Sequence, residues 1–375
     1  MSAIRAERKG HELDIDHAEA VQLPEISGFH DFFLIPQVVL AVRKIRADGD
    51  IPPGQATTTR QQDNALQNER QNGKDLMNKK FTPLVIILVI VLGGLYWVFG
   101  LPMVGNPDIP TSPEAIARGA YLWEAGGCGA CHQHDGAQAP IGGYVIEVEE
   151  PFPNVFHTPN ITPDEETGIG GWTGRDFILA LKHGRSPSGG FYWPSFPYRT
   201  YKNMTDEDVL DLAAFVMSLD PVRNEVPDHE LPWWQFDFLM AGWNIMADMM
   251  EGEPPAFDES DPQKVRGAYL ARALGHCGEC HTPRNGLGMM VMAEEFTGAE
   301  GFAPPVDPEA LSSWTRFDFV GLLQLGMTAS FDFVGGEMGD VIEHTKNLTE
   351  EDQNAYAAFF IPVEAEGGAD DFNFD

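Results

Sequence analysis

Two short stretches, 126–136 (GGCGACHQHDG) and 275–286 (GHCGECHTPRNG), contain all four cysteines of this 375-residue chain. Each stretch spaces its two cysteines as C-x-x-C and places a histidine directly after the second one. This spacing is compatible with three chemistries: one zinc ion shared by both pairs, two redox-active disulfides, or two covalently attached haems. The fold must therefore hold each cysteine pair on a single turn of backbone.

Haem attachment accounts for every residue of the motif. Two thiols three positions apart add to the two vinyl groups of one porphyrin, and the following histidine ligates the iron. Zinc leaves that histidine unexplained, and dithiol exchange is typical of a thioredoxin-like βαβ pattern, which we do not find. We therefore expect two covalently bound haem c groups with iron, attached at Cys128, Cys131, Cys277 and Cys280, with His132 and His281 as proximal ligands.

Covalent haem attachment implies export, and an apolar segment fits that expectation. Residues 83–104 run for 22 positions without a charge, and a helix of that length spans about 33 Å, enough for a bilayer core. Lys79 and Lys80 precede the segment, so the positive-inside rule predicts a cytoplasmic N-terminus and an exported C-terminal region. We expect an uncleaved single-pass anchor in a bacterial inner membrane, with the haem domains in the periplasm.

The first 76 residues are polar, and their only apolar patch is too short to span a bilayer. The sequence from Met77, MNKKFTPLVIILV, resembles a complete signal-anchor with its own initiator. Residues 1–76 are therefore interpreted either as a cytoplasmic tail or as an over-extended start.

The charge is concentrated after the apolar segment. Residues 1–104 hold 11 basic and 12 acidic residues, whereas residues 105–375 hold 13 and 45. So acidic a region excludes nucleic acid as a partner. It is compatible with a basic docking partner, and equally with solubility in a saline habitat.

The exported region is an internal repeat. RGAYL occurs at 118–122 and again at 266–270, and WTGRDFILALKHG (172–184) matches WTRFDFVGLLQLG (314–326). Near the end of each copy, a threonine followed by acidic residues marks the start of a helix at Thr205 and Thr349. Each copy thus predicts a helix before the haem motif, a middle helix and a closing helix, with no strand needed.

An aromatic and methionine-rich stretch, residues 231–250, lies between the copies. Either it packs against a haem edge or bridges the two domains, or it exposes an apolar patch that docks a membrane partner.

Four segments resemble the dihaem cytochromes c related to the cytochrome subunits of membrane-bound alcohol and gluconate dehydrogenases. The segments are 158–172 (TPNITPDEETGIGGW), 194–209 (PSFPYRTYKNMTDEDV), 266–288 (RGAYLARALGHCGECHTPRNGLG) and 335–359 (GGEMGDVIEHTKNLTEEDQNAYAAF). The resemblance implies an all-α fold of two tandem class I cytochrome c domains behind a single N-terminal transmembrane helix. The familiar subunits carry three haems and a C-terminal anchor, so this chain departs from their pattern.

The predicted organisation has six parts. They are a cytoplasmic polar tail (1–80), a transmembrane anchor (81–104), cytochrome c domain 1 (105–225), a linker (226–262), cytochrome c domain 2 (263–361) and an acidic tail (362–375).

The resemblance also implies a sixth iron ligand for each haem. For haem 2 it is Met338, in GGEMGD. At the matching place in domain 1 the chain has Phe196, which cannot ligate iron, so Met204, His157, His183 and an open iron all stay possible for haem 1.

Two His/Met haems make an electron relay, because thioether sulfur favours ferrous iron. We expect a membrane-anchored carrier rather than an enzyme, with no catalytic residues of its own. Its redox partners would be a dehydrogenase or quinol-oxidising complex on one side and a soluble cytochrome or terminal oxidase on the other. The alternatives are substrate chemistry at an open haem 1, or a fixed haem subunit of a terminal oxidase.

Overall fold

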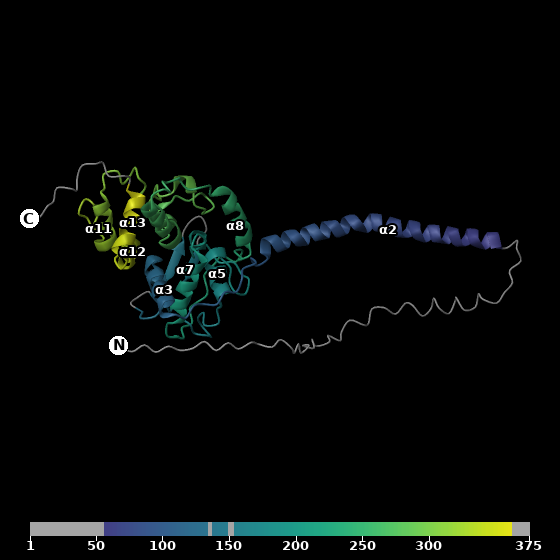
Figure 1. Cartoon of the computed structure of the whole chain (residues 1–375), viewed down its shortest axis with the longest axis horizontal. Coiled ribbons are helices and arrows are strands. Elements are labelled where there is room, and N and C mark those ends of the chain that lie inside the picture. Colours follow the sequence, from purple (N-terminus) through teal and green to yellow (C-terminus); the bar gives the residue numbers. More distant parts are fainter. Residues whose placement is uncertain (1–55, 134–136, 149–153, 362–375) are drawn as a thin grey trace, which may run out of the picture. The chain divides into compact units, whose positions relative to one another are not determined.

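The protein is described from a computed structural model that covers residues 56–133, 137–148 and 154–361 (Figure 1). The chain divides into two units, residues 1–86 and residues 87–375. The predicted acidic tail and most of the predicted cytoplasmic tail lie outside the described residues. The described part is mostly helical, as the sequence predicts.

Helix α2 (Ala56–Phe99) contains the apolar segment of the chain as far as Phe99. Its large apolar side chains between Leu84 and Tyr96 are exposed. Among the described residues, no helix is both long enough and apolar enough to cross a membrane. The transmembrane anchor at 81–104 stays a prediction.

The repeat has the same order of helices in both copies. We call residues 105–225 the first half and residues 263–361, together with Pro262 at the start of its first helix, the second half. In the first half the helices are α3 (Pro113–Ala125), α4 (Cys128–His132), α5 (Gly174–His183), α6 (Tyr198–Tyr201) and α7 (Asp206–Met217). In the second half they are α9 (Pro262–Tyr269), η2 (Leu270–Leu274), α10 (Gly278–His281), η3 (Met292–Glu294), α11 (Arg316–Leu325), α12 (Glu337–Thr345) and α13 (Glu350–Phe360).

The middle and closing helices begin where the sequence predicts. Thr173 and Thr315 form capping boxes with the aspartates three residues later, so two of the amides at the start of α5 and of α11 have side-chain acceptors. The hydroxyls of Thr205 and Thr349 accept hydrogen bonds from the third residues of α7 and α13.

In each half the first helix packs on the closing helix: α3 on α7 and α9 on α13. At Gly119 and Gly267 the two helices approach backbone to backbone. A Cβ at these two positions would lie 1.9 Å from the carbonyl oxygen of Asp211 and 2.0 Å from that of Ala355. Only glycine allows so close an approach, which explains the glycine of both RGAYL segments.

The arginine of each RGAYL segment bonds its own half. Arg118 donates to Asp211 at 2.6 Å, and Arg266 donates to Asp352 at 2.7 and 2.8 Å. Both carboxylates are nearly fully buried. These ion pairs tie the first helix of each half to its closing helix.

The tyrosine of each RGAYL segment crosses to the other half. Tyr121 donates to Asp352 at 2.6 Å, and Tyr269 donates to Asp208. The two halves therefore join through reciprocal contacts made by the same motif residue.

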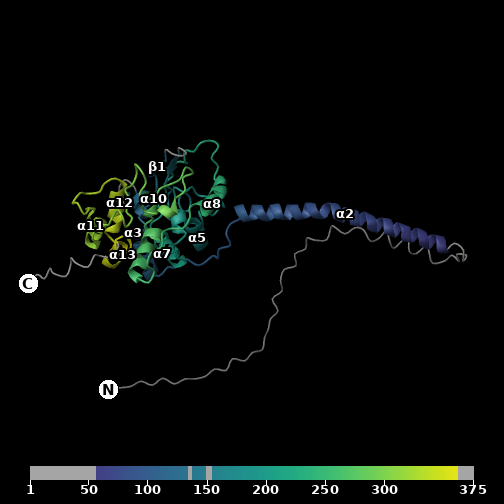
Figure 2. The same cartoon turned by 90° about the horizontal axis from the view of Figure 1, so that it is seen from above.

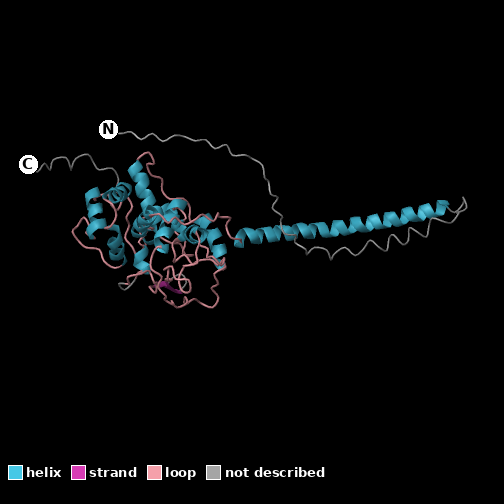
Figure 3. Cartoon of the chain, turned by 60° about the horizontal axis from the view of Figure 1, so that its bottom comes forward, coloured by secondary structure: helices cyan, strands magenta, loops and turns pink. Residues whose placement is uncertain are grey.

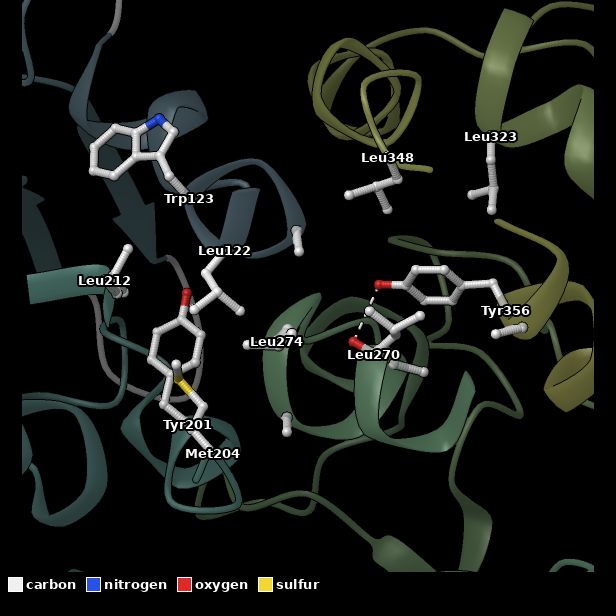
Figure 4. Close-up of a cluster of buried hydrophobic side chains, with 14 of the residues drawn as sticks. Leu122, Trp123, Tyr201, Met204, Leu212, Leu270, Leu274, Leu323, Leu348 and Tyr356 are labelled. Carbon is white, nitrogen blue, oxygen red and sulfur yellow. Dashed lines mark hydrogen bonds between the residues drawn. The ribbon is translucent and has the colours of Figure 1, made fainter. Parts of the chain in front are cut away.

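Figure 4 shows the core at this junction, where Leu122 of α3 and Leu274 of η2 come together. The second copy has one more residue between RGAYL and the first cysteine than the first copy has. It is accommodated in the single π-helical turn η2, where the Gly275 amide bonds the Leu270 carbonyl at 2.7 Å. A one-residue insertion thus leaves the motif in place.

The expectation that no strand is needed was wrong in one place. β1 (Val145–Val148) and β2 (Asn154–His157) form an antiparallel pair, with Val145 opposite His157 (Figure 3). β-branched residues occupy half of these eight positions and favour extended backbone. The pair is small, and the helical prediction holds for the rest of the described chain.

The linker, residues 226–262, contains helix α8 (Leu239–Met250), which lies beside α5 in Figures 1 and 2. Its Asn244 accepts a hydrogen bond from Tyr198 at 2.7 Å, and its Trp243 donates to the carbonyl of Leu287 at 3.0 Å. The linker therefore bridges the two halves, one of the two packing roles considered for it.

Candidate functional site

The first motif forms a short helix, α4, whose single turn carries Cys128 and Cys131 on one side of the first half. In the second motif, Cys277 immediately precedes α10 and Cys280 lies within it. All four thiols are half-buried and free. Each pair therefore lies on one turn of backbone, as thioether attachment to a porphyrin requires.

The thiols do not have the character of a redox dithiol. Burial raises the pKa of Cys128 and of Cys277 to about 12, and burial followed by the charge of Glu337 raises that of Cys131 to about 11. Dithiol exchange needs a thiol whose pKa is lowered. The described residues also contain no group of three or more His, Cys, Asp or Glu that could hold a metal ion.

In both motifs the histidine ring faces the carbonyl oxygen of a proline. Nδ1 of His132 lies 3.0 Å from the carbonyl oxygen of Pro159, and Nδ1 of His281 lies 2.7 Å from that of Pro304. A carbonyl oxygen can only accept, so Nδ1 carries the proton and the Nε2 lone pair is left for a metal.

Burial keeps these imidazoles neutral, because it penalises the charged form. It lowers the pKa of His132 to about 4 and lowers that of His281 as well. Neutral imidazole with an oriented ring is the form that ligates iron. Two thiols and this histidine in each half fit the attachment chemistry of haem c.

The segment after β2 also supports the first motif. The Thr158 hydroxyl donates to the carbonyl oxygen of Cys131 at 3.0 Å, and the next residue is Pro159. The segment TPNIT was part of the family resemblance, but the roles of Thr158 and Pro159 were not predicted. A proline after a threonine gave no signal of its own that its carbonyl would orient a histidine.

Met338 is the second residue of α12 and is half-buried. It lies twelve positions after Gly326, the glycine that ends α11, and Phe196 lies twelve positions after Gly184, which ends α5. The structure therefore places Phe196 at the equivalent of Met338. The Phe196 ring packs against the rings of Tyr192 and Tyr201, with centroid distances of 5.6 and 5.7 Å.

The three candidate ligands for the first centre have different surroundings. Met204 is 3% exposed and packs beside Tyr201, in the cluster that Cys128 also contacts (Figure 4). His183 is exposed at the end of α5. The buried Nε2 of His157 has no hydrogen-bond partner.

His157 lies two residues before Pro159, whose carbonyl oxygen faces Nδ1 of His132. Met204 is the candidate that lies in the core of the first half.

The position before the first cysteine of each motif has a left-handed backbone, with φ 58° at Gly127 and 41° at His276. The His276 ring contacts Tyr201 of the first half, with ring centroids 5.8 Å apart. His276 was not among the predicted functional residues. Its presence where the repeat has glycine is the signal that could have identified it.

The protein-family model for cytochrome c matches residues 116–220, which include the first motif. A diheme cytochrome c-type protein of Cereibacter sphaeroides is 36% identical over 294 residues, covering 75% of this chain and 97% of that protein. The chain belongs to the cytochrome c family.

Two further relatives of this cytochrome are subunits of dehydrogenases. The fructose dehydrogenase cytochrome subunit of Gluconobacter japonicus is 36% identical over 288 residues, covering 72% of this chain and 58% of that protein. The gluconate 2-dehydrogenase cytochrome c subunit of Pantoea cypripedii is 34% identical over 295 residues, covering 73% of this chain and 64% of that protein. The cytochrome is therefore an electron-transfer protein that carries haem c and has redox protein partners, as its motifs predict.

Proposed function

We propose that this cytochrome is an electron relay with two covalently bound haem c groups, one in each half. The observation that carries the proposal is the repetition of the proximal arrangement, in which each motif histidine faces a proline carbonyl, Pro159 or Pro304. Haem iron supplies a one-electron change when bound. The protein's residues attach it, orient the imidazole and surround it with buried apolar groups, all of which tune its potential.

Haem stoichiometry tests the proposal directly. The wild-type chain should contain two haems covalently attached per polypeptide by pyridine haemochrome and intact mass. Replacing both Cys277 and Cys280 by Ala should leave one, and so should replacing Cys128 and Cys131. One haem in the wild type, or zinc in its place, would refute it.

The second ligands are proposed to be Met338 and Met204. Met338 is half-buried at the start of α12, and Met204 is buried in the core of the first half, which supports these assignments. Met338→Ala and Met204→Ala should each remove part of the weak long-wavelength charge-transfer band of thioether-ligated ferric haem and lower one potential. A bis-histidine spectrum in the wild type would displace Met204 in favour of His157 or His183.

A second candidate function is enzyme chemistry at the first haem. One observation supports it: Phe196 stands where the second half has Met338. On that alternative the first iron is open and reacts with a small substrate. The reduced wild type should bind carbon monoxide slowly at both centres if it is a closed relay. Rapid binding at one centre would favour the enzyme.

We also propose that the cytochrome is attached to a bacterial inner membrane through α2 and works in the periplasm. The exposed apolar side chains between Leu84 and Tyr96 support attachment. The full chain should stay in the membrane fraction after alkaline carbonate extraction, and a chain lacking residues 77–104 should be released. Release of the full chain would contradict attachment.

The partners are proposed to be a dehydrogenase or a quinol-oxidising complex as donor, and a soluble cytochrome or terminal oxidase as acceptor. The relatives that are dehydrogenase subunits support a dehydrogenase as donor. Mild-detergent isolation followed by identification of co-purifying proteins would distinguish a mobile carrier from a fixed oxidase subunit.

A further inference from the structure

Helix α12 contacts the first half close to each of its ends. At its start, the Tyr144 hydroxyl donates to the carboxylate of Glu337 at 3.2 Å. Towards its end, Nδ1 of His344 donates to Oε2 of Glu124 in α3 at 3.0 Å. The helix that carries Met338 is therefore held by the half that contains the other haem motif.

The His344 ring lies against the first motif itself. A Cβ added to Gly129, between Cys128 and Cys131, would be 2.7 Å from Cε1 and 3.2 Å from Nε2 of that ring. Asn347, just after α12, donates to the same Glu124 oxygen at 2.9 Å. The end of α12 is therefore both packed against the first motif and hydrogen-bonded to α3.

We propose that His344 is a positioning residue that couples the two centres. By resting on Gly129 and bonding Glu124, it sets the position of α12 and hence of Met338. Six residues of helix separate His344 from Met338, or about 9 Å along the axis. Displacement of the ring at the first motif moves the ligand of the second centre, and this inference rests on the proposed ligation by Met338.

The two motifs offer a matched pair of substitutions. Gly129→Ala forces the His344 ring to move and also meets the side-chain oxygen of Gln133 at 2.9 Å. Gly278→Ala, at the same position of the second motif, meets the Thr282 hydroxyl at 3.2 Å and the Phe296 ring at 3.8 Å. Each variant is made in the full chain loaded with haem. The readouts are the thioether charge-transfer band and the rate of cyanide binding to the ferric protein.

Gly129→Ala should weaken the charge-transfer band and raise the cyanide-binding rate about tenfold, a factor that corresponds to ~1.4 kcal/mol of ligation free energy. Gly278→Ala should leave both readouts within about twofold of the wild type. His344→Ala should shift both in the same direction as Gly129→Ala, and it serves as the second variant if Gly129→Ala does not fold. Adding Gly129→Ala to His344→Ala should have little further effect, because the ring is gone and the methyl then meets only the end of the Gln133 side chain.

A double-mutant cycle with Met338→Ala decides the route. If the coupling acts through Met338, Gly129→Ala adds nothing in that background. An unchanged response there, or equal responses of Gly129→Ala and Gly278→Ala, would overturn the coupling while leaving the relay intact. If Met338→Ala alone changes neither readout, the ligand assignment fails and the coupling fails with it, whereas the haem count stands.

Discussion

The two halves of the molecule use one set of contacts but distribute them differently. In the first half, Asp211 receives Arg118 and Asp208 receives the tyrosine of the other half. In the second half, Asp352 receives both Arg266 and Tyr121. One carboxylate therefore does on one side what two carboxylates do on the other, so the repeat preserves the interaction rather than the residue.

The same loop is covered in one half and open in the other. Phe191 in the first half is half-buried, and its amide donates to Asp237 of the linker at 3.4 Å. Its equivalent Phe333 is 73% exposed, and Phe331 is 78% exposed. The Phe191 ring lies 6.5 Å from the Phe99 ring and 3.8 Å below the Arg185 guanidinium, so these two residues cover it and the linker adds the bond to its amide.

The largest expected effect concerns the shared carboxylate. Asp352→Ala leaves Arg266 and Tyr121 without their acceptor, and should lower the free energy of unfolding by about 3 kcal/mol. Asp208→Ala removes the acceptor of Tyr269 alone, and should cost about 1 kcal/mol. Urea unfolding of the two variants measures this, with the exposed Glu350→Ala on α13 as control. If both variants lose the same free energy of unfolding, the sharing of one carboxylate by two donors has no effect on stability.

The close approaches should weigh equally in both halves. Gly119→Ala and Gly267→Ala should each destabilise the protein by about 2–3 kcal/mol, because the added methyl meets backbone of the closing helix. Gly321→Ala is the control, since it lies in α11 with open space around it and should stabilise by about 0.5 kcal/mol. A large difference between the first two variants would show that the repeat is packed unequally.

The crossing tyrosines test the junction itself. Tyr121→Phe and Tyr269→Phe each remove a hydroxyl that reaches the other half, and each should cost about 1.5 kcal/mol in thermal or urea unfolding. Tyr198→Phe, whose hydroxyl bonds the linker, is a matched control for loss of a partly buried hydroxyl contact. If neither crossing variant is destabilised, the junction depends on its apolar core alone.

The smallest effect is a pH dependence specific to Asp352. Arg266 and Tyr121 together lower the pKa of this carboxyl despite its burial. Its contribution is therefore present above the ordinary aspartate pKa of about 3.9 and is lost as the pH falls through the lower folded value. The difference in unfolding free energy between wild type and Asp352→Asn should shrink as the pH falls from about 5 to about 3. A difference that grows in acid would contradict the assignment.

The sequence predicted what short-range chemistry determines. The capping threonines Thr205 and Thr349 and the spacing of the cysteines are each encoded within a few residues, and the helices follow them. Proline carbonyls facing the motif histidines were not predicted, because His281 and Pro304 meet only through the path of a long loop. The contact of His344 with Gly129 was missed for the same reason, since 215 positions separate the two residues.

The β1–β2 pair and the ligand of the first centre show another limit. Eight residues of strand carry too weak a pattern to be distinguished from loop, and the helical periodicity nearby dominates the interpretation. Met204 could be proposed from its place in the sequence, and its burial beside Tyr201 is consistent with that proposal. Ligation itself depends on which side of the haem a residue faces, which no local pattern encodes.

The crossing of Tyr121 to Asp352 has a consequence for how the protein is made. These two residues lie 231 positions apart, so the tyrosine leaves the ribosome long before its acceptor exists. At about 5–20 residues per second, the surface of the first half waits for its partner for roughly ten to fifty seconds. Until that acceptor exists, the first helix of the first half has contacts of its own with the closing helix, those that Arg118 and Gly119 make with Asp211.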